Sequence, residues 1–285
     1  MSKGYLHLIF ASVIIGSLGV FSRWIGLPAP VQNFYRYLFA AIALASYFVV
    51  NREPLFRANG NFKGLIISSI SYAIASVLLF VGFSNTSIAN TVVLFYTAPL
   101  FVALLAPFIL KERLKNITIA SLIIAFVGVL LLSFLSFGLD SSKQIIGISA
   151  GLGSGIAFAL MIISTKAITG TLSFLRINFY QNLLAAAVLL PVTFAYSYSL
   201  SIKAVGLLII IGVLHTALAR TLWVSGVSKV PAQDAGAVGY IEPLSATIFG
   251  LMFFGELPPT VGIIGAILIL LSSYLVTTKS ARTSS

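Results

Sequence analysis

The sequence predicts an all-α integral membrane protein with ten transmembrane helices, arranged as two inverted five-helix repeats. Three observations predict this fold class. The composition is too apolar for a soluble surface, ten segments are long enough to cross a bilayer, and the second half of the chain repeats the first. The predicted halves are residues 1–140 and 141–285, and the polar loop Asp140–Gln144 joins them at the midpoint.

The composition excludes most soluble functions. Of the 285 residues, 59% are hydrophobic and 8% are charged, and the mean hydropathy is +1.08. A soluble domain has about 25% charged residues, so a soluble enzyme and a disordered chain are both excluded. The absence of cysteine excludes disulfides and thiolate metal sites. The two histidines and the scattered carboxylates do not form a metal site, and no cofactor-binding motif is present.

Each predicted span has the length that a helix needs to cross the hydrocarbon core, about 20 mostly apolar residues. The spans are near-continuous apolar runs, which indicates helices rather than the alternating strands of a β-barrel. The first run follows Met-Ser-Lys directly and has no convincing cleavage site, so we expect a first helix rather than a removable signal peptide. In chain order the predicted spans are Gly4–Ser22, Pro30–Val50, Gly64–Ser84, Ile88–Leu110, Ile117–Phe137, Ile146–Ala167, Phe174–Tyr196, Ala204–Val227, Ala232–Phe254 and Thr260–Thr277.

The basic residues predict the orientation. Of the 17 lysines and arginines, twelve lie on the side of the N-terminus, three lie on the opposite side, and Arg36 and Arg220 lie inside spans. Cytoplasmic loops retain Lys and Arg, so both termini are predicted to be cytoplasmic. Because the charges are spread thinly over loops, the net charge of +11 does not indicate a nucleic-acid partner.

The two halves repeat each other in sequence. Residues 33–41 and 178–186 share the pattern Asn-Phe-Tyr, and then Ala-Ala. Gly82, Tyr96, Pro99 and Glu112 recur as Gly226, Tyr240, Pro243 and Glu256, all at one offset of 144. Because each half holds an odd number of spans, the second half must enter the membrane inverted. Inverted repeats are typical of secondary transporters, which bind substrate near the midplane between the halves.

The residues around these repeats resemble a known family. Tyr96-Thr-Ala-Pro-Leu-Phe and Leu110-Lys-Glu-Arg-Leu114 are similar to the fourth-helix signature of the EamA family, in the drug/metabolite transporter superfamily. Tyr240-Ile-Glu-Pro-Leu and Phe254-Gly-Glu-Leu257 resemble the ninth-helix counterpart, and residues 215–223 resemble the eighth helix. The resemblance covers essentially the whole chain. It implies that helices 1–4 and 6–9 surround a central cavity, that helices 5 and 10 are peripheral, and that the substrate is an amino acid or another exported metabolite.

Two titratable residues near mid-span are the candidate coupling residues. Glu242 lies about 11 residues into its span, or roughly 16 Å deep, where a carboxylate is costly unless it is neutral, paired or hydrated. Its repeat mate is Ala98, so the fold does not require the charge. Glu242 is therefore a candidate proton, cation or substrate-amine site, or else a partner of the kink at Pro243. His215 lies at a similar depth and either relays protons beside Glu242 or packs against a backbone carbonyl.

Seven residues are candidates for substrate binding. Arg36 and Arg220 can each hold a carboxylate in a bidentate fork, or can snorkel to the nearer interface. Tyr96 and Tyr240 are repeat mates that lie too deep for the aromatic belt, so we expect them to line the cavity. Tyr72, Trp223 and Gln181 would complete an aromatic and polar lining suited to an amphipathic substrate.

Prolines and small residues indicate how the helices move and pack. Pro99 and Pro243 are predicted to break the fourth and ninth helices at matching positions, where they can serve as hinges. A ridge on the sixth helix, Gly147, Gly151, Gly155 and Ala159, permits close backbone approach. A shorter ridge on the tenth helix suggests a homodimer through the fifth and tenth helices.

The sequence thus predicts an inner-membrane secondary transporter that exports small metabolites, either amino acids or aromatic and amphipathic compounds, by alternating access. Its partners would be the substrate, the bilayer and protons as the candidate coupling ion, with no cofactor. Three alternatives remain open. A channel lacks a visible charged ring or filter loop, a membrane enzyme lacks a clustered catalytic set, and a nucleotide-sugar exchanger calls for more basic residues in the cavity.

Overall fold

The computed structural model describes residues 3–55, 62–86, 88–133, 142–255 and 260–280. Within these residues, nine helices are long and apolar enough to cross a membrane, and Asn116–Leu131 is a shorter apolar helix. The prediction of a ten-helix integral membrane protein is confirmed. In chain order the spans are α1 (Lys3–Gly16) with α2 (Leu18–Ile25), α3 (Ala29–Val50), α4 (Phe62–Asn85), α5 (Ile88–Phe95) with α6 (Ala98–Ile109), α7 (Asn116–Ser133), α8 (Ser142–Ile168), α9 (Phe174–Thr193), α10 (Ile202–Ile210) with the π-helix η1 (Ile211–Leu218) and α11 (Ala219–Val227), α12 (Ala232–Gly239) with α13 (Ile241–Phe254), and α14 (Thr260–Leu275) with η2 (Val276–Ser280).

The predicted boundaries differ from the observed ones mainly at loops. The three basic residues on the side opposite the N-terminus, Arg23, Lys143 and Lys203, lie outside the predicted spans, but each lies in a terminal turn of a helix, because the helices extend beyond the apolar runs. Asp140 and Ser141 of the predicted midpoint loop, the end of the fifth span and Glu256 lie outside the described residues, whereas Ser142–Gln144 form the first turn of α8.

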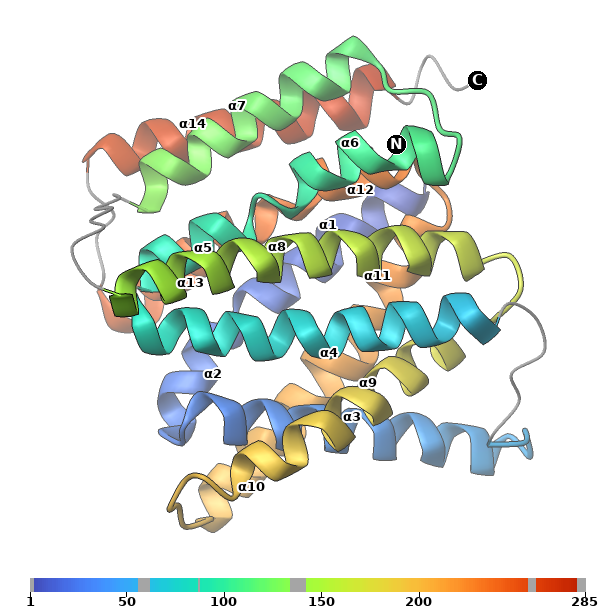
Figure 1. The fold of residues 1–285 in the computed structure, drawn as a ribbon, viewed down its shortest axis with the longest axis vertical. Helices are drawn as coiled ribbons and strands as arrows, with labels where there is room; N and C mark the ends of the chain where they lie inside the picture. Colours follow the sequence, from blue (N-terminus) through green and yellow to red (C-terminus); the bar gives the residue numbers. More distant parts are fainter. Residues whose placement is uncertain (1–2, 56–61, 87, 134–141, 256–259, 281–285) are drawn as a thin grey trace.

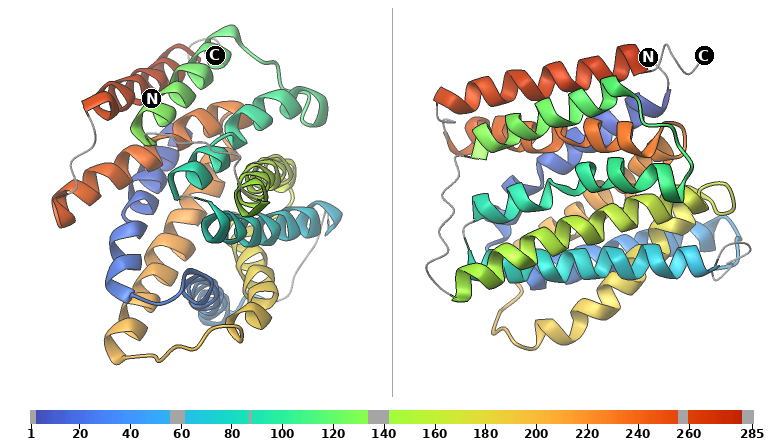
Figure 2. Two further views of the ribbon diagram at one scale, coloured as in Figure 1. Left: turned by 60° about the vertical axis from the view of Figure 1, so that its left-hand side comes forward. Right: turned by 45° about the horizontal axis from the view of Figure 1, so that its top comes forward.

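Helices from the two halves of the chain pack against each other throughout the bundle. Helix α3 packs on α9, α6 on α12, and α7 on α14. Helix α4 packs along α8, and α1 packs along α11 and α13. Figure 1 shows α7 and α14 lying together at one edge of the bundle, which agrees with the peripheral place expected for the fifth and tenth spans. The two views in Figure 2 show the same bundle from other sides, with α7 and α14 again lying together at its edge.

The small residues on α8 allow this helix to approach its neighbours closely. A Cβ atom at Gly155 would lie 2.7 Å from the carbonyl oxygen of Leu94, and one at Gly147 would lie 2.8 Å from the Cβ of Thr86. Gly151 faces Leu94 in the same way. The predicted ridge therefore packs against α5 and the end of α4. On α14, Gly262 is buried within the chain, so its small face already has a partner there.

Four spans break or widen at the middle of the bundle. The break between α5 and α6 falls at Tyr96 and Thr97, just before Pro99, and the break between α12 and α13 falls at Tyr240, just before Pro243. Both breaks lie at the predicted matching positions, because proline lacks the N–H that would continue the helix. The break at Ser17 between α1 and α2 and the π-helix η1 were not predicted.

Candidate functional site

A cavity of about 850 Å³ lies where these breaks meet. Its volume is typical of small-molecule sites. Spans 1, 2, 3, 4, 6, 8 and 9 contribute lining residues, whereas α7, α9 and α14 contribute none among the described residues. Nine of the predicted functional residues line this cavity: Arg36, Tyr72, Tyr96, Pro99, His215, Arg220, Trp223, Glu242 and Pro243.

Two predicted lining residues lie elsewhere. Tyr240 is fully buried, and its hydroxyl donates a hydrogen bond of 2.9 Å to the carbonyl oxygen of Tyr96. Gln181 on α9 is also fully buried and donates to Ser68 at 2.5 Å and to Thr165 at 2.9 Å. Period and depth along a helix do not reveal which side faces the cavity, and this is why both positions were placed in the lining.

The contact between Tyr240 and Tyr96 joins the two breaks directly. The N–H of Leu100 bonds to Thr97 rather than to Tyr96, so the carbonyl of Tyr96 needs another donor. The Tyr240 hydroxyl supplies it, and the two rings lie 6.0 Å apart between centroids. Helix α6 also meets α12 closely, since a Cβ at Gly236 would lie 3.0 Å from Pro99. The two helix breaks therefore meet across the interface between the halves.

Arg220 lies in an aromatic box. Its guanidinium carbon lies 4.5 Å from the centroid of Trp223, 4.7 Å from Tyr72 and 5.8 Å from Phe158. The side chain is 5% exposed, and its hydrogen bond to protein is to the thioether of Met161, a weak acceptor. Its Nε has no partner, and no ion pair to it forms within the described part of the chain. Ring faces stabilise a cation, but they leave its N–H donors unused.

Arg36 also lies over an aromatic ring in the cavity lining. Its guanidinium lies 4.7 Å from the ring centroid of Tyr37 and donates to the Tyr37 hydroxyl at 2.9 Å. That hydroxyl lies 2.7 Å from Ser76, which in turn donates to the carbonyl of Tyr72. The Nε of Arg36 has no partner among the described residues. Arg36 thus lines the cavity and does not snorkel to the membrane interface.

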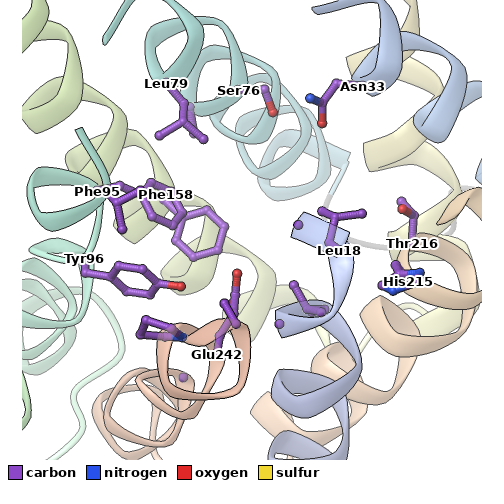
Figure 3. A pocket seen from close by; sticks show the side chains of 18 of the residues that line it. Leu18, Asn33, Ser76, Leu79, Phe95, Tyr96, Phe158, His215, Thr216 and Glu242 are labelled. Carbon is purple, nitrogen blue, oxygen red and sulfur yellow. The ribbon is translucent and has the colours of Figure 1, made fainter. Parts of the chain in front are cut away.

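Glu242 lies within the electrostatic influence of both arginines and is not a neighbour of His215. Figure 3 shows the hydroxyl of Tyr96 pointing toward the carboxyl group of Glu242. The charges that act on Glu242 are those of Arg36 and Arg220. The backbone at Glu242 packs closely against the end of α1, because a Cβ atom at Gly16 would lie 2.8 Å from the Glu242 carbonyl oxygen.

His215 is not the polar neighbour of Glu242 that the sequence suggested. Its Nε2 lies 2.8 Å from the Ser17 hydroxyl, which also donates to the carbonyl of Ile14. Its ring packs edge-on against Phe21, and Figure 3 shows Leu18 between His215 and Glu242. The π-helical turn rotates His215 toward the first span, and mid-span depth alone could not indicate this. The π-bulges of α-helices are frequent at functional sites.

A polar network closes the end of the bundle opposite the cavity mouth. Asp234 is 1% exposed and accepts hydrogen bonds from Tyr5 at 2.7 Å and Thr118 at 2.9 Å. Glu112 pairs with Lys166 at 3.6 Å and accepts from the N–H of Ala232 at 2.7 Å. Lys166 also donates to the carbonyls of Val227 and Val230.

This network, which we call the closing network (Tyr5, Glu112, Thr118, Lys166 and Asp234), joins both halves of the chain. The cavity instead extends to Arg23, Asn33, Phe83 and Gly250, near the other ends of the spans. From the sequence, Glu112 was noted only as the repeat mate of Glu256, and Asp234 was not singled out. Asp234 lies near the end of its span, where a carboxylate is usually solvated, so the sequence did not indicate that it is buried and hydrogen-bonded to other spans.

Comparison with known proteins adds the following findings. The profile of the EamA-like transporter family matches residues 2–134 and again residues 145–278. A protein of Clostridium kluyveri, named as an uncharacterized transporter, is 24% identical over 96% of this chain and 93% of its own. The inner membrane transporter YicL of Salmonella typhimurium is 25% identical, with 98% and 97% covered. One crystal structure shares the fold with a TM-score of 0.86 at 15% identity, over 99% of both chains.

Proposed function

Because the chain belongs to the EamA-like transporter family and is a multi-pass membrane transporter, we propose that it exports a small amphipathic metabolite by alternating access. The substrate carries a carboxylate and an apolar or aromatic body. The single observation that carries this proposal is the cavity in which Arg220 lies unpaired among Tyr72, Phe158 and Trp223. Such a site offers N–H donors to an anion and ring faces to an apolar group. The direction, export, follows the family resemblance.

The packing of the halves supports alternating access. If a two-fold axis relates residues 1–140 to residues 141–285, spans 2, 4 and 5 should pack against their repeat mates, which are spans 7, 9 and 10. The contact between spans 3 and 6 should likewise have an equivalent between their repeat mates, which are spans 8 and 1. These are the contacts of α3 with α9, α6 with α12, α7 with α14, α4 with α8, and α11 with α1. Rocking about such an axis would open the closing network while it closes the cavity mouth.

Three alternatives remained open from the sequence: a channel, a membrane enzyme and a nucleotide-sugar exchanger. Each is less consistent with the observations than a metabolite exporter. A channel needs a continuous wet pore, and the closing network interrupts the path beyond the cavity. An enzyme is disfavoured because the family and the named relatives are transporters. A nucleotide-sugar exchanger would have to accommodate two phosphates, and the cavity offers Arg36 and Arg220 against the negative charge of Glu242.

Filling the cavity tests the proposal. Ala246 lines the cavity and its side chain is exposed there, so Ala246→Trp adds a bulky ring without entering the packed interior. We expect at least a tenfold loss of uptake into proteoliposomes of a carboxylate-bearing aromatic compound, with thermal stability in detergent unchanged. Ala120 on α7 is equally exposed and lies outside the cavity. Ala120→Trp is the matched control and should transport normally. Equal transport by the two variants would contradict a substrate site in this cavity.

We further propose that the protein lies in the cell inner membrane with both termini in the cytoplasm, so that the cavity described above faces outward. The chain has no cysteine, so single cysteines report accessibility cleanly. In whole cells, Gln144→Cys should react with a membrane-impermeant maleimide, whereas Lys229→Cys should react only after the cells are opened. The reverse pattern would invert the topology.

A further inference from the structure

Apart from the exposed Arg23 at its mouth, the cavity is lined by two cations and one anion, and this imbalance bears on the charge of the substrate. Arg36 and Arg220 both line the cavity, and Glu242 is the carboxylate that lines it among the described residues. Each guanidinium acts electrostatically on Glu242, yet neither forms an ion pair with it. The Nε atoms of both arginines lack a hydrogen-bond partner. With Glu242 ionised, Arg36, Arg220 and Glu242 together carry one positive charge in excess.

The other groups around Glu242 do not cancel this excess. Tyr96, on the link between α5 and α6, points its neutral hydroxyl toward Glu242. Tyr37 and Tyr72 contact the guanidinium groups with neutral rings and hydroxyls. His215 is bonded to Ser17 on the first span. Arg23 lines the mouth, where it lies over the ring of Phe254 and is exposed. It adds further positive potential at the entrance.

We propose that the transported substrate is a monoanionic organic acid without an amine, whose carboxylate binds between Arg36 and Arg220 and whose apolar body lies against Phe158 and Trp223. This inference rests on the proposed function and narrows its substrate class. A zwitterionic amino acid would take Glu242 for its ammonium group and one arginine for its carboxylate. The second arginine would then have no counter-charge once the cavity closes, and burying an unpaired charge is strongly unfavourable.

A monoanion avoids this penalty. It supplies the second negative charge, so that two guanidinium groups face two carboxylates. The same net charge also disfavours other ligands. A bound amine cation would increase the net positive charge of the cavity, and a bound dianion would make the net charge negative. The selectivity should therefore follow net charge when the apolar body of the ligand is kept constant.

Four ligands with one phenyl group and a short linker test this charge rule. They are 3-phenylpropanoate with one negative charge, phenylalanine as the zwitterion, 2-phenylethylamine as the cation and benzylmalonate as the dianion. Calorimetric titration of the detergent-solubilised protein at neutral pH should give the lowest Kd for 3-phenylpropanoate. We expect it to bind at least tenfold more tightly than phenylalanine. An equal or lower Kd for phenylalanine or the amine would overturn the proposal, as would the absence of binding by all four.

Changing the charge of the lining should change the preferred ligand. Glu242→Gln leaves an excess of two positive charges, so benzylmalonate should gain at least tenfold in affinity relative to 3-phenylpropanoate. Glu53→Gln removes a carboxylate that pairs with Arg176 outside the cavity, and it should leave the order unchanged. An unchanged order in Glu242→Gln would overturn the charge rule.

The charge rule and the proposed function can fail separately. If phenylalanine or the amine binds most tightly and Ala246→Trp abolishes that binding, the cavity remains the substrate site and only the charge rule is wrong. If Ala246→Trp leaves transport and binding intact, the proposed function itself is wrong.

Discussion

Replacing Arg220 by alanine is expected to reduce the transport of a carboxylate-bearing substrate by roughly 30-fold or more, since losing one partner of a buried charged hydrogen bond costs about 2–5 kcal/mol. The guanidinium of Arg220 is the buried cation of the cavity, and its ring contacts pre-orient it for an incoming anion. Arg220→Lys keeps the charge but lacks the planar fork, so we expect it to recover only part of the activity. Initial rates of uptake into proteoliposomes measure the effect.

A structural role for Arg220 would give a different result. Lys229 is exposed and lies outside the cavity, so Lys229→Ala controls for the loss of a positive charge and should transport normally. Thermal unfolding and gel filtration of each variant separate transport from folding. If Arg220→Ala lowers thermal stability or fails to accumulate in the membrane, while Arg220→Lys transports at the wild-type rate, Arg220 serves packing rather than substrate binding.

Glu242→Gln is expected to retain the fold, to remove the dependence of transport on pH and to slow turnover. Glutamine keeps the shape of the side chain and can still bond to Tyr96, but it cannot ionise. The expectation rests on the proposal that Glu242 exchanges its interaction with Arg36 and Arg220 for a proton, which would link the charge of the cavity to pH. The rate of transport should be compared in vesicles across a series of external pH values.

The same measurement on Glu53→Gln provides the control, because Glu53 is half-exposed and bonded to Arg176 outside the cavity. Its pH profile should match that of the native protein. A Glu242→Gln variant with unchanged rate and unchanged pH profile would mean that Glu242 supports the kink beside Pro243, and that substrate moves by facilitated exchange without a coupled proton.

Much of the fold could be predicted because its determinants are local. The length and apolarity of each run identify a spanning helix regardless of its neighbours, and the proline positions locate the breaks at Tyr96 and Tyr240 because proline removes a backbone donor. The glycine ridge on α8 likewise signalled a close contact, since only small side chains allow it.

The arrangement of the site was less predictable because it depends on helix rotation. Depth along the chain placed Glu242, His215 and Gln181 near mid-span, but it did not give the direction of each side chain. The π-helical turn directs His215 to Ser17, and α9 directs Gln181 to Ser68 and Thr165. Tyr37 and Phe158 were missed for the same reason. In a hydrophobic helix an aromatic residue looks alike whether it faces a cavity or a neighbouring helix.

The central claim is that the two halves of the chain move against each other and open the closing network. Replacing Glu112 and Lys166 by cysteine converts their ion pair of 3.6 Å into a site for a short bis-methanethiosulfonate, which links the two thiols through reducible disulfides, in a chain that has no other cysteine. We predict that the linked protein binds substrate but does not transport it, that reduction restores transport, and that each single-cysteine variant treated with the reagent transports normally. Transport by the fully linked protein at the rate of the unlinked one would contradict alternating access through this network.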